Sequence, residues 1–428
     1  MEEKNRKKII LMAKKAKEAF LKVANISSNN RNKILFYFAK ALKKNRDFIL
    51  QENQKDINLA KRLNFSSALI DRLTLSPARL EAMCNSFLKL RELPDPVGRI
   101  LKDWTTPAGL KIFKVSVPIG VILIIYESRP DVTADCLGLC IKSGNVVILR
   151  GGSEAFYSNQ AIFKVCHQVL KDFSYPSYGA NFVFVREKWA VDLLLKLNDD
   201  IDLVIPRGGE GLIRKITRIS RIPVIKHYKG ICHIYVDKDA DLEMAKKVCF
   251  NAKVQRPATC NAMESMLVHR DIALKFLPLM LREFLSAKVK IRGCPLTLKI
   301  ARETGIFSKE MFKEATDKDY STEYLDLILA VKVVKDLEEA VAHINKYGSH
   351  HSDAIITKNK ESAQEFLKKV DSACVYHNAS TRLTDGYQFG MGAEMGISTD
   401  RLHARGPMAL EELTTYKYTV YGNGQIRI

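Results

Sequence analysis

The sequence predicts an α/β protein built on a doubly wound, mostly parallel sheet, with a second α/β region after it. Continuously apolar segments alternate with helical segments from Val121 onward. The same alternation begins again after Cys260. A strand without a polar face is typical of a parallel sheet that helices cover on both sides. The chain also has 428 residues, more than one ordinary core holds, so we expect two or more domains.

The first region, residues 3 to about 95, is predicted to be mostly helical. Between residues 31 and 63, apolar residues recur at three- and four-residue steps with polar residues between them. The stretch ELPDPVGR, residues 92–99, ends this pattern with two prolines and a glycine. The next segment alternates as in an exposed hairpin, and GVILIIYE, residues 120–127, is then apolar as in a buried strand.

The following elements complete the two α/β regions. In the first region, further strands are predicted at residues 145–150, 180–185 and 201–209. In the second, strands are predicted at 264–269, 324–334, 352–358 and 373–378, and helices at 273–285, 336–348 and 360–370. The last segment, residues 414–428, alternates and has no helix to cover it. It is therefore predicted to be a strand that joins the edge of a sheet.

Composition restricts the class of protein. The net charge is +20, but lysine and arginine are spread along the chain, and no nucleic-acid-binding motif accompanies them. We therefore expect a basic solvated surface and no nucleic-acid partner, although a positive field would attract an anionic substrate. No apolar run reaches the roughly 18 residues of a membrane span, so no membrane association is expected. The nine cysteines form no CxxC pair, which indicates reduced thiols in the cytoplasm.

Two glycine-rich turns directly follow predicted strands. ILRGGSEA spans residues 148–155 and IPRGGEGLI spans residues 205–213. Ligands of open α/β sheets bind at the carboxyl ends of strands, where glycine lets backbone N–H groups approach a phosphate. Neither turn is the GxGxxG fingerprint, and a glycine pair after a strand is often only a turn. Together, with an arginine beside each, they favour a phosphate-bearing cofactor.

Cys260 lies in an unusual setting, VQRPATCNAMESMLVH, residues 254–269. A polar segment with a proline precedes it and an apolar strand follows, which suits an exposed nucleophilic thiol. The alternative is a buried, inert cysteine. His343, His350 and His351 lie close together in sequence, but no HExxH motif or acidic partner at ligand spacing accompanies them. We interpret them as loop histidines and expect no metal.

Several long stretches together resemble one family, the γ-glutamyl phosphate reductases of the aldehyde dehydrogenase superfamily. These are the glutamate-5-semialdehyde dehydrogenases of proline biosynthesis. The resemblance covers essentially the whole chain. The stretches that carry it are residues 116–162, 205–213, 251–269, 321–334 and 378–418.

The resemblance implies an aldehyde-dehydrogenase-like fold with three parts. These are a Rossmann-like cofactor domain (1–255, with an oligomerisation hairpin at 101–117), a catalytic domain (256–395) and a C-terminal oligomerisation segment (396–428). It also implies that NADPH reduces L-glutamyl 5-phosphate to the semialdehyde with release of phosphate. Cys260 would attack the acyl phosphate and form a thioester, which hydride from NADPH then reduces. NADP(H) is thus the implied cofactor, and a homo-oligomer is expected.

The family's roles are carried over onto matching positions. The resemblance assigns Cys260 as nucleophile with Asn261 and Ser128 at the oxyanion site, and Arg129, Gly392 and Glu394 to the substrate's amino-acid end. The cofactor residues it implies are Arg150, Gly151, Ser153, Glu154, Arg207, Gly208, Gly209 and Glu323. Arg150 would suit the 2′-phosphate of NADP, and Glu323 the nicotinamide ribose. Asp131 and Ala258 depart from the family's pattern, although neither change removes a reacting group.

Other interpretations remain open at this point. A semialdehyde or acyl-CoA reductase of the same superfamily would use the same cysteine. A non-catalytic RNA-associated protein is the alternative from a different class. The superfamily's water-activating glutamate is not recognisable upstream of Cys260, which favours transfer to phosphate over hydrolysis. The chain has no room for a fused glutamate 5-kinase, so transient contact with a separate kinase is a further hypothesis.

Overall fold

The computed structural model describes residues 2–226 and 228–427, and the chain divides into two units. The first unit comprises Met1–Lys226, Gly390–Gly396 and Met408–Ile428, and the second comprises His227–Phe389 and Ile397–Pro407. The expected boundary at residue 255 therefore moves to 226. The reason is that the strand and helix between these positions belong to the sheet and core of the second unit. The closing segment is likewise shared between the units and does not form a separate body.

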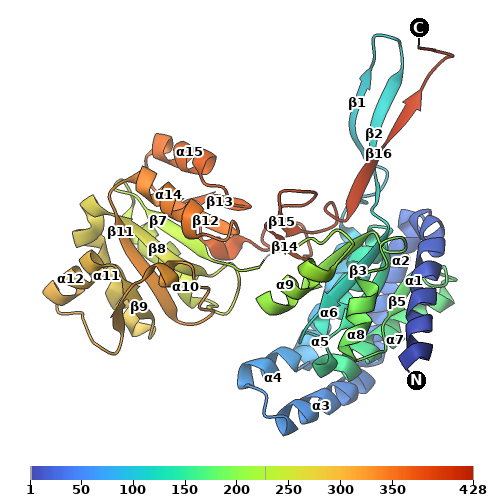
Figure 1. The fold of residues 1–428 in the computed structure, drawn as a ribbon, viewed down its shortest axis with the longest axis horizontal. Helices are drawn as coiled ribbons and strands as arrows, with labels where there is room; N and C mark the ends of the chain where they lie inside the picture. The colour runs from blue at the N-terminus through green and yellow to red at the C-terminus, as the bar shows by residue number, and fades with distance from the viewer. Residues whose placement is uncertain (1, 227, 428) are drawn as a thin grey trace. The chain divides into compact units, whose positions relative to one another are not determined.

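The first unit begins with five helices, which confirms the predicted helical region (Figure 1). They are α1 (Glu2–Ala24), α2 (Ser28–Lys44), α3 (Arg46–Arg62), α4 (Ser67–Leu73) and α5 (Pro77–Glu92). Serine side chains cap three of them: Ser27, Ser66 and Ser76 each accept a hydrogen bond from a backbone N–H of the first turn. Such a cap stabilises a helix by about 1 kcal/mol.

A four-stranded parallel sheet forms the centre of this unit, in the order β5-β4-β3-β6. The strands are β3 (Val121–Tyr126), β4 (Val146–Gly151), β5 (Ala180–Phe182) and β6 (Leu203–Arg207). The helices that alternate with them are α6 (Asp131–Lys142), α7 (Phe156–Asp172), α8 (Lys188–Leu194) and α9 (Glu210–Ile219), with a short 3-10 turn, η1 (Ser153–Ala155), before α7. Every residue of β3 is buried, as its apolar sequence predicts. Val121, Leu123 and Ile125 pack with Ile9 and Ala13 of α1 in one core cluster.

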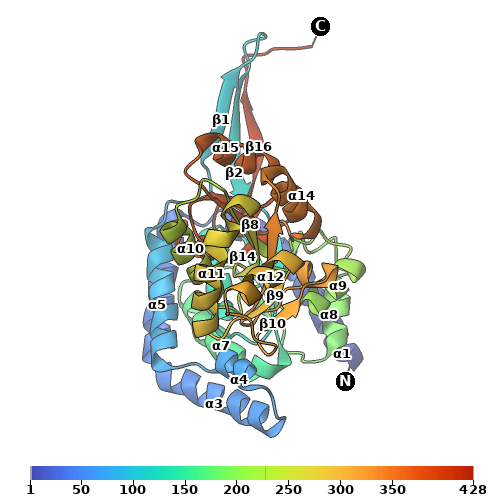
Figure 2. The same ribbon diagram turned by 90° about the vertical axis from the view of Figure 1, so that its left-hand side faces the viewer.

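A separate antiparallel arm completes the first unit. It contains β1 (Ile100–Thr105), β2 (Lys111–Pro118) and β16 (Thr414–Tyr421), in the order β1-β2-β16. In both views the three strands lie side by side and extend away from the helices of their unit (Figures 1 and 2). β16 pairs with β2 from Thr414 opposite Pro118 to Tyr421 opposite Lys111. The closing segment thus joins the sheet edge of a hairpin in its own chain.

The second unit holds a seven-stranded sheet in the order β10-β9-β11-β8-β7-β12-β13, whose strand pairs are all parallel. The strands are β7 (Cys232–Val236), β8 (Met263–His269), β9 (Lys290–Gly293), β10 (Phe312–Glu314), β11 (Ile328–Val334), β12 (Ser352–Ile356) and β13 (Cys374–His377). The helices are α10 (Leu242–Val254), α11 (Arg270–Ser286), α12 (Pro295–Glu303), α13 (Asp317–Tyr320), α14 (Leu337–Tyr347) and α15 (Lys360–Lys369), with the 3-10 turn η2 (Thr381–Leu383). A small sheet pairs β14 (Gly396–Ser398) with β15 (Gly406–Met408).

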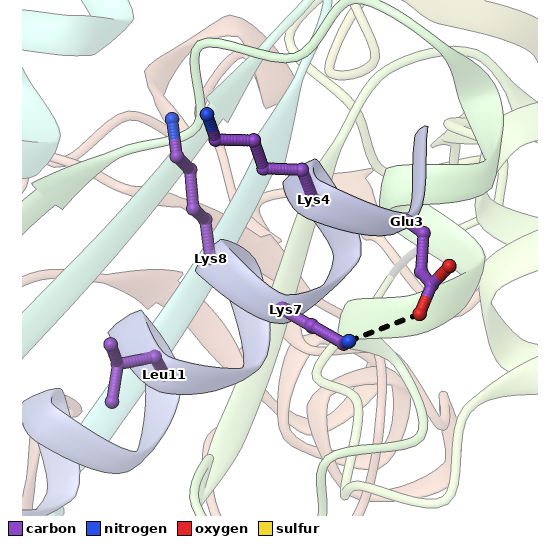
Figure 3. Close-up of a pocket in the computed structure, with 5 residues that line it drawn as sticks. All are labelled: Glu3, Lys4, Lys7, Lys8 and Leu11. Carbon is purple, nitrogen blue, oxygen red and sulfur yellow. Dashed lines mark ion pairs between the residues drawn. The ribbon is translucent and has the colours of Figure 1, made fainter. Parts of the chain in front are cut away.

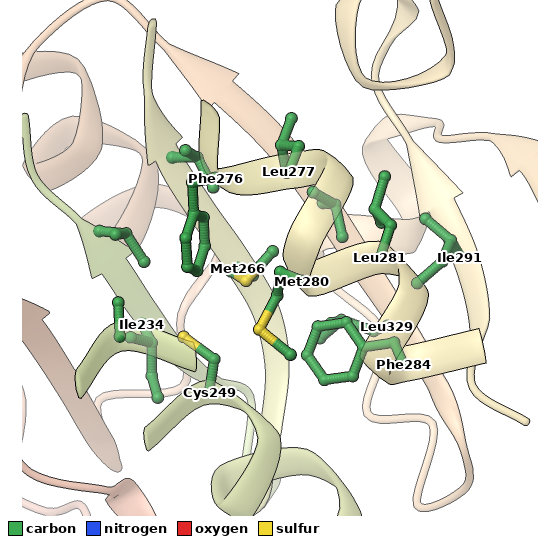
Figure 4. Close-up of a cluster of buried hydrophobic side chains, with 14 of the residues drawn as sticks. Ile234, Cys249, Met266, Phe276, Leu277, Met280, Leu281, Phe284, Ile291 and Leu329 are labelled. Atoms are coloured by element: carbon green, nitrogen blue, oxygen red, sulfur yellow. The ribbon is translucent and has the colours of Figure 1, made fainter. Parts of the chain in front are cut away.

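Apolar side chains cover the two faces of this seven-stranded sheet separately. On one face, Ile234 and Met266 pack with Phe276, Met280 and Phe284 of α11 (Figure 4). On the other face, the next residue of each strand, such as Tyr235 and Leu267, packs under α14 and α15. Truncating one of the buried phenylalanines to alanine costs about 3–5 kcal/mol. The core therefore fixes the start of β8, which carries the loop of the candidate site.

Within the described residues, no helix combines the length and the apolar character that a membrane crossing requires. A shallow pocket lies beside α1 and is lined by Glu3, Lys4, Lys7, Lys8 and Leu11 (Figure 3). Lys7 and Glu3, one turn apart on this helix, form an ion pair of 3.0 Å. None of the residues around this pocket belongs to the candidate site that the sequence predicts.

Candidate active site

Cys260 lies on a short loop between the end of α10 and the start of β8, in the second unit. Hydrogen bonds within the loop hold its shape: Thr259 Oγ1 donates to the carbonyl oxygen of Arg256 at 2.9 Å, and the N–H of Ala262 donates to the carbonyl of Thr259 at 3.0 Å. Cys260 is half-buried, whereas Asn261 and the strand after it are buried. The loop therefore presents the thiol at the start of a central strand rather than in the core.

Asn261 holds this loop to η2 and its flanking residues. Its Nδ2 donates to the carbonyl of Thr384 at 2.9 Å and to the carbonyl of Arg382 at 3.4 Å. Its Oδ1 accepts hydrogen bonds from Thr259 Oγ1 and from the guanidinium of Arg382. Both ends of the amide are thus in use, so in this structure Asn261 acts as a positioning residue beside the thiol.

Arg382 is a cation close to Cys260 that the sequence reasoning did not single out. Burial and the neighbouring Arg256 lower the pKa of Arg382, and the thiol of Cys260 acts in the opposite direction. Its Nε donates to Gln255 Oε1 at 2.9 Å, which fixes the guanidinium against the loop. A nearby cation stabilises a thiolate, the reactive form of cysteine. The only signal in the sequence is the arginine within NASTRLTDGY, residues 378–387.

The backbone of Gly230 is in close contact with Cys260. A Cβ atom at Gly230 would lie 1.8 Å from the carbonyl oxygen of Cys260, so any side chain would displace the loop. Two residues further on, the buried thiol of Cys232 donates to the same carbonyl oxygen at 3.2 Å and lies 3.7 Å from His351 Nδ1. Burial raises the pKa of Cys232, so it remains a thiol. The segment from Gly230 to Cys232 thus packs against the carbonyl of Cys260 and helps to fix the nucleophile loop.

Glu323, assigned to the cofactor ribose, lies in the loop before β11. Its Oε1 accepts a hydrogen bond from the N–H of Gly230 at 2.9 Å. Two residues later, Leu325 has φ of 54°, a left-handed conformation that costs a leucine about 1–2 kcal/mol. The N–H of Leu325 donates to Glu264 Oε1 at 3.1 Å, which helps to hold this conformation. The structure thus brings Glu323 and Cys260 to the same segment, Gly230–Cys232.

A fully buried ion pair fixes both ends of the nucleophile loop. Lys253 Nζ, at the end of α10, lies 2.7 Å from Glu264 Oε2, in β8, and both side chains are 0% exposed. Burial raises the pKa of Glu264 to about 7, while Lys253 acts against this rise. Removing one partner of such a pair costs about 3–5 kcal/mol, because the other charge stays buried. The pair therefore ties the loop of Cys260 to the loop of Glu323.

In the first unit, the turn after β6 suits a phosphate. Gly209 is the N-cap residue of α9, and its N–H donates to Glu127 Oε2 at 2.9 Å. A Cβ at Gly208 would lie 2.3 Å from the same oxygen, whereas Gly209 and Gly211 have open space around them. A carboxylate oxygen of the chain thus occupies a position at which a helix N-terminus attracts an anion. This observation fits the assignment of Arg207, Gly208 and Gly209 to a cofactor pyrophosphate.

The turn after β4 is arranged differently from the expectation. The two Nη atoms of Arg150 each donate at 2.8 Å, one to the carbonyl of Gly151 and one to the carbonyl of Arg186. Arg150 is only 8% exposed, so it holds the backbone and offers no free fork to a phosphate. The N-terminus of α7 is also occupied, because the buried Asp56 accepts hydrogen bonds from the N–H groups of Tyr157 and Ser158.

Ser128 and Glu154 lie together in the first unit, although the expectations gave them separate roles. Glu154 Oε1 accepts hydrogen bonds from the N–H of Ser128 at 2.7 Å and from its Oγ at 3.0 Å. Ser128 has φ of 51°, a conformation that this double contact helps to hold. Ser153 is exposed beside Glu154. The hydroxyl of Ser128 is therefore directed at a carboxylate in this structure.

The residues assigned to the substrate's amino-acid end also lie in the first unit. Gly392 has φ of 73°, and a Cβ there would lie 2.7 Å from Leu93, so the position needs glycine. Burial raises the pKa of Asp135 on α6 to about 7, and Asp131, Arg207 and Glu394 also act on it. Glu394 is thus near the start of α6 and the end of β6. Arg129 is half-buried in the loop between β3 and α6.

The three histidines that the sequence places close together make separate contacts. His343 is a buried residue of α14, so the expectation of a loop histidine is wrong for it. His350 and His351 do lie in a loop, where His350 Nδ1 is 2.5 Å from the carbonyl of Asp371 and His351 Nδ1 is 2.9 Å from Ser352 Oγ. In the described part of the chain, no group of three or more His, Cys, Asp or Glu side chains is arranged to hold a metal ion.

Comparison with known proteins gives consistent matches. Residues 1–295 match the aldehyde dehydrogenase family. A γ-glutamyl phosphate reductase of Thermodesulfovibrio yellowstonii is 53% identical over 419 residues, which cover 98% of each chain. The crystal structure of a γ-glutamyl phosphate reductase of Thermotoga maritima is similar with a TM-score of 0.94 and 44% identity, covering 98% of this chain and 100% of that one. A glyceraldehyde-3-phosphate dehydrogenase of Methanocaldococcus jannaschii, 17% identical with a TM-score of 0.67 over 98% of this chain and 94% of that one, shares the fold.

Proposed function

The chain belongs to the γ-glutamyl phosphate reductases of the aldehyde dehydrogenase family, and on that premise we propose that Cys260 carries out its reaction. The enzyme reduces L-glutamyl 5-phosphate to L-glutamate 5-semialdehyde and phosphate, a step of proline biosynthesis, with NADPH as reductant. The observation that carries the proposal is the position of Cys260, a half-buried thiol on a braced loop with a guanidinium nearby. An inert core cysteine would not need either feature.

In the chemical step, the thiolate sulfur of Cys260 attacks the acyl carbon of the substrate. The sulfur–carbon bond forms, the carbon–oxygen bond to phosphate breaks, and phosphate leaves with the bonding electrons. When bound, NADPH supplies the hydride that brings the acyl carbon to the aldehyde level. The backbone N–H of Cys260 is the donor that we assign to the developing oxyanion. The sulfur leaves as thiolate, ready for the next cycle.

Arg382 and Arg256 are the residues that we assign to the leaving phosphate. Arg382 interacts electrostatically with both Cys260 and Arg256, and Arg256 belongs to the same loop as Cys260. These two arginines favour the thiolate before attack and balance the negative charge that grows on the phosphate during it. The hydrogen bond from Arg382 Nε to Gln255 Oε1 keeps the guanidinium of Arg382 in place while the substrate is absent.

Gly230, Cys232 and Glu323 serve as positioning or cofactor-holding residues in this proposal. Gly230 connects the carbonyl of Cys260 with the carboxylate of Glu323, which we assign to the nicotinamide ribose. In the first unit, Gly208 and Gly209 hold the pyrophosphate, and Gly151, Ser153 and Glu154 flank the adenosine end. Arg129, Gly392 and Glu394 are assigned to the amino-acid end of the substrate. Ser128 remains a candidate donor for the oxyanion once Glu154 is engaged elsewhere.

The test is the reaction run in reverse. The wild-type enzyme should reduce NADP⁺ with glutamate 5-semialdehyde only when phosphate is present. Cys260→Ser should lose more than about a thousandfold in rate, as removal of a nucleophile does, while still binding NADPH. Cys294→Ser is the matched control, because Cys294 is the other half-buried cysteine of the second unit. Activity in Cys260→Ser, or a wild-type rate confined to acyl-CoA substrates, would contradict the proposal.

Three further proposals concern the setting of the reaction. The aromatic, exposed arm of β1, β2 and β16 suits a homo-oligomer, and deletion of residues 412–428 should then lower the mass in sedimentation. A cytoplasmic location suits the reduced state that Cys260 requires.

The acyl phosphate is short-lived in water, so we propose transient contact with a separate glutamate 5-kinase. Sedimentation of the mixed proteins without association would contradict this proposal.

A further inference from the structure

We infer that Arg186 is the residue that selects NADPH over NADH, by binding the 2′-phosphate of the cofactor. The inference rests on the proposed function for its assignment of the turn after β4 to the adenosine end. It replaces the expectation that Arg150 has this task. Arg186 follows β5 in the first unit and is exposed.

The contacts of Arg150 exclude it from this role. A phosphate dianion needs donors that are free to point at it, and the two Nη atoms of Arg150 already donate to two backbone carbonyls. Its Nε is buried as well, and the residue as a whole is only 8% exposed. Moving Arg150 toward a ligand would remove the donor from both carbonyls. Its place in the structure is therefore fixed.

Those same contacts place Arg186 beside the adenosine turn. β5 and β4 are neighbours in the sheet, paired from Val147 opposite Ala180 to Leu149 opposite Phe182. Arg150, which ends β4, donates directly to the carbonyl of Arg186. Both arginines thus lie at the carboxyl end of adjacent strands, where open α/β sheets bind dinucleotides. A ribose held over the end of β4 would have Arg186 as the next exposed cation along the sheet.

The side chain of Arg186 is held ready for an anion. Its guanidinium carbon lies 4.0 Å from the ring centre of Phe156 and 4.9 Å from that of Tyr157. Stacking on rings holds a guanidinium without using its N–H groups. Among the described residues, none accepts a hydrogen bond from this guanidinium. Its planar fork is therefore available to bind a phosphate with two hydrogen bonds.

Charged side chains of both signs surround Arg186. Lys55 Nζ lies 5.6 Å from the ring centre of Tyr157, so a second cation flanks the same ring. Three carboxylates lie in this neighbourhood: Asp56 is buried and accepts three hydrogen bonds at the start of α7, Glu52 pairs with Lys55 Nζ at 2.6 Å, and Glu187 follows Arg186 in the chain. A 2′-phosphate at Arg186 would therefore be bound by the hydrogen bonds of the stacked guanidinium itself. NADH, which lacks this phosphate, would gain nothing from Arg186.

Equilibrium binding of the two cofactors without substrate tests the inference. Titrations of the full-length protein, followed by nucleotide fluorescence, should show that Arg186→Gln raises the Kd for NADPH by about ten- to a hundredfold. The Kd for NADH should change by less than about twofold. Arg186→Lys, which keeps the charge without the fork, should recover part of the loss.

Arg91→Gln is the matched control. Arg91 is another exposed arginine of the first unit, stacked 5.2 Å from the ring centre of Phe36, with its carbonyl accepting a bond from Lys142. It should leave both Kd values unchanged. An equal loss for NADPH and NADH in Arg186→Gln, or no preference for NADPH in the wild type, would overturn the inference. If only the proposed reaction were wrong, the glutamate semialdehyde assay would fail while these binding differences persisted.

Discussion

His343 offers a sharp test of the core of the second unit, because it is a titratable group buried without hydrogen bonds. The residue is 4% exposed, and neither Nδ1 nor Nε2 has a partner. Its ring packs against Tyr347 at 4.6 Å, Tyr320 at 4.8 Å and His233 at 5.7 Å between ring centres. Burial lowers the pKa of His343 to about 2, and the neighbouring His233 and lysines add to this effect.

The sign and size of the pH effect follow from this pKa. An unfolded histidine titrates near pH 6.5, so at pH 5 the unfolded chain binds a proton that folded His343 does not. The contribution of neutral His343 to the free energy of unfolding is therefore complete above about pH 6.5 and is lost as the pH falls. Between pH 7.5 and pH 5 the loss is about 2 kcal/mol. His343→Phe removes the titrating group and keeps a ring among the tyrosines.

The quantity to measure is the difference between the wild type and His343→Phe. Asp135 and Glu264, whose pKa values are raised to about 7, act in the opposite direction, since their stabilisation is lost as the pH rises. These two carboxyl groups are present in the wild type and in the variant, so their contributions cancel in the difference. At pH 7.5 the variant should be no less stable, because two buried nitrogens without partners are removed.

The assay must report on the second unit. The chain has two tryptophans, Trp104 and Trp189, and both lie in the first unit, so tryptophan fluorescence would follow the wrong part. Hydrogen exchange of peptides from β7 and β12, corrected for intrinsic rates at each pH, gives opening free energies beside His343. A difference that stayed constant between pH 7.5 and pH 5 would refute the reasoning, as would protonation of His343 seen above pH 5 by NMR.

Two other predictions concern the loop of Cys260. Gly230→Ala should lower kcat at least about tenfold and change the rate at which iodoacetamide alkylates Cys260, because its Cβ would lie 1.8 Å from a backbone oxygen. Gly211→Ala, with open space around it, should change neither quantity. Glu264→Gln should lower the free energy of unfolding by about 3–5 kcal/mol and raise the Kd for NADPH, because Lys253 keeps a buried charge and the amide has only one oxygen for two donors, Lys253 Nζ and the N–H of Leu325. Urea unfolding followed by circular dichroism and cofactor titration check this, and an unchanged NADPH Kd would limit the ion pair to a role in stability.

The buried strands of both units could be predicted because their sequences carry the signal locally. VILIIY at residues 121–126 is apolar throughout and forms β3, fully buried. β7 was not predicted, and this displaced the expected domain boundary. Its sequence, CHIYV, contains His233, whose burial depends on Asp353, 120 residues away, at 3.1 Å. No local pattern indicates such a partner.

A residue of the candidate site could be singled out from the sequence only where its immediate neighbours are distinctive. Cys260 has a distinctive sequence setting, and the structure places it, half-buried, on the loop before the central strand β8. Arg150 was expected at a ligand, but its donors serve backbone carbonyls that only the packed turn reveals. The link between Lys253 and Glu264 crosses the nucleophile loop, and the approach of Gly230 to Cys260 joins segments 30 residues apart. Such contacts depend on tertiary packing, which sequence spacing does not encode.

The order of the strands in the arm has a consequence for the newly made chain. β2 ends at Pro118, but its partner β16 begins only at Thr414, roughly 300 residues later. At ~5–20 residues per second, a ribosome needs about 15–60 s to make the intervening chain. Throughout that interval the hairpin exposes an edge to other nascent chains. The hairpin carries three lysines, Lys102, Lys111 and Lys114. Charged side chains on an exposed strand discourage pairing with other chains until translation ends.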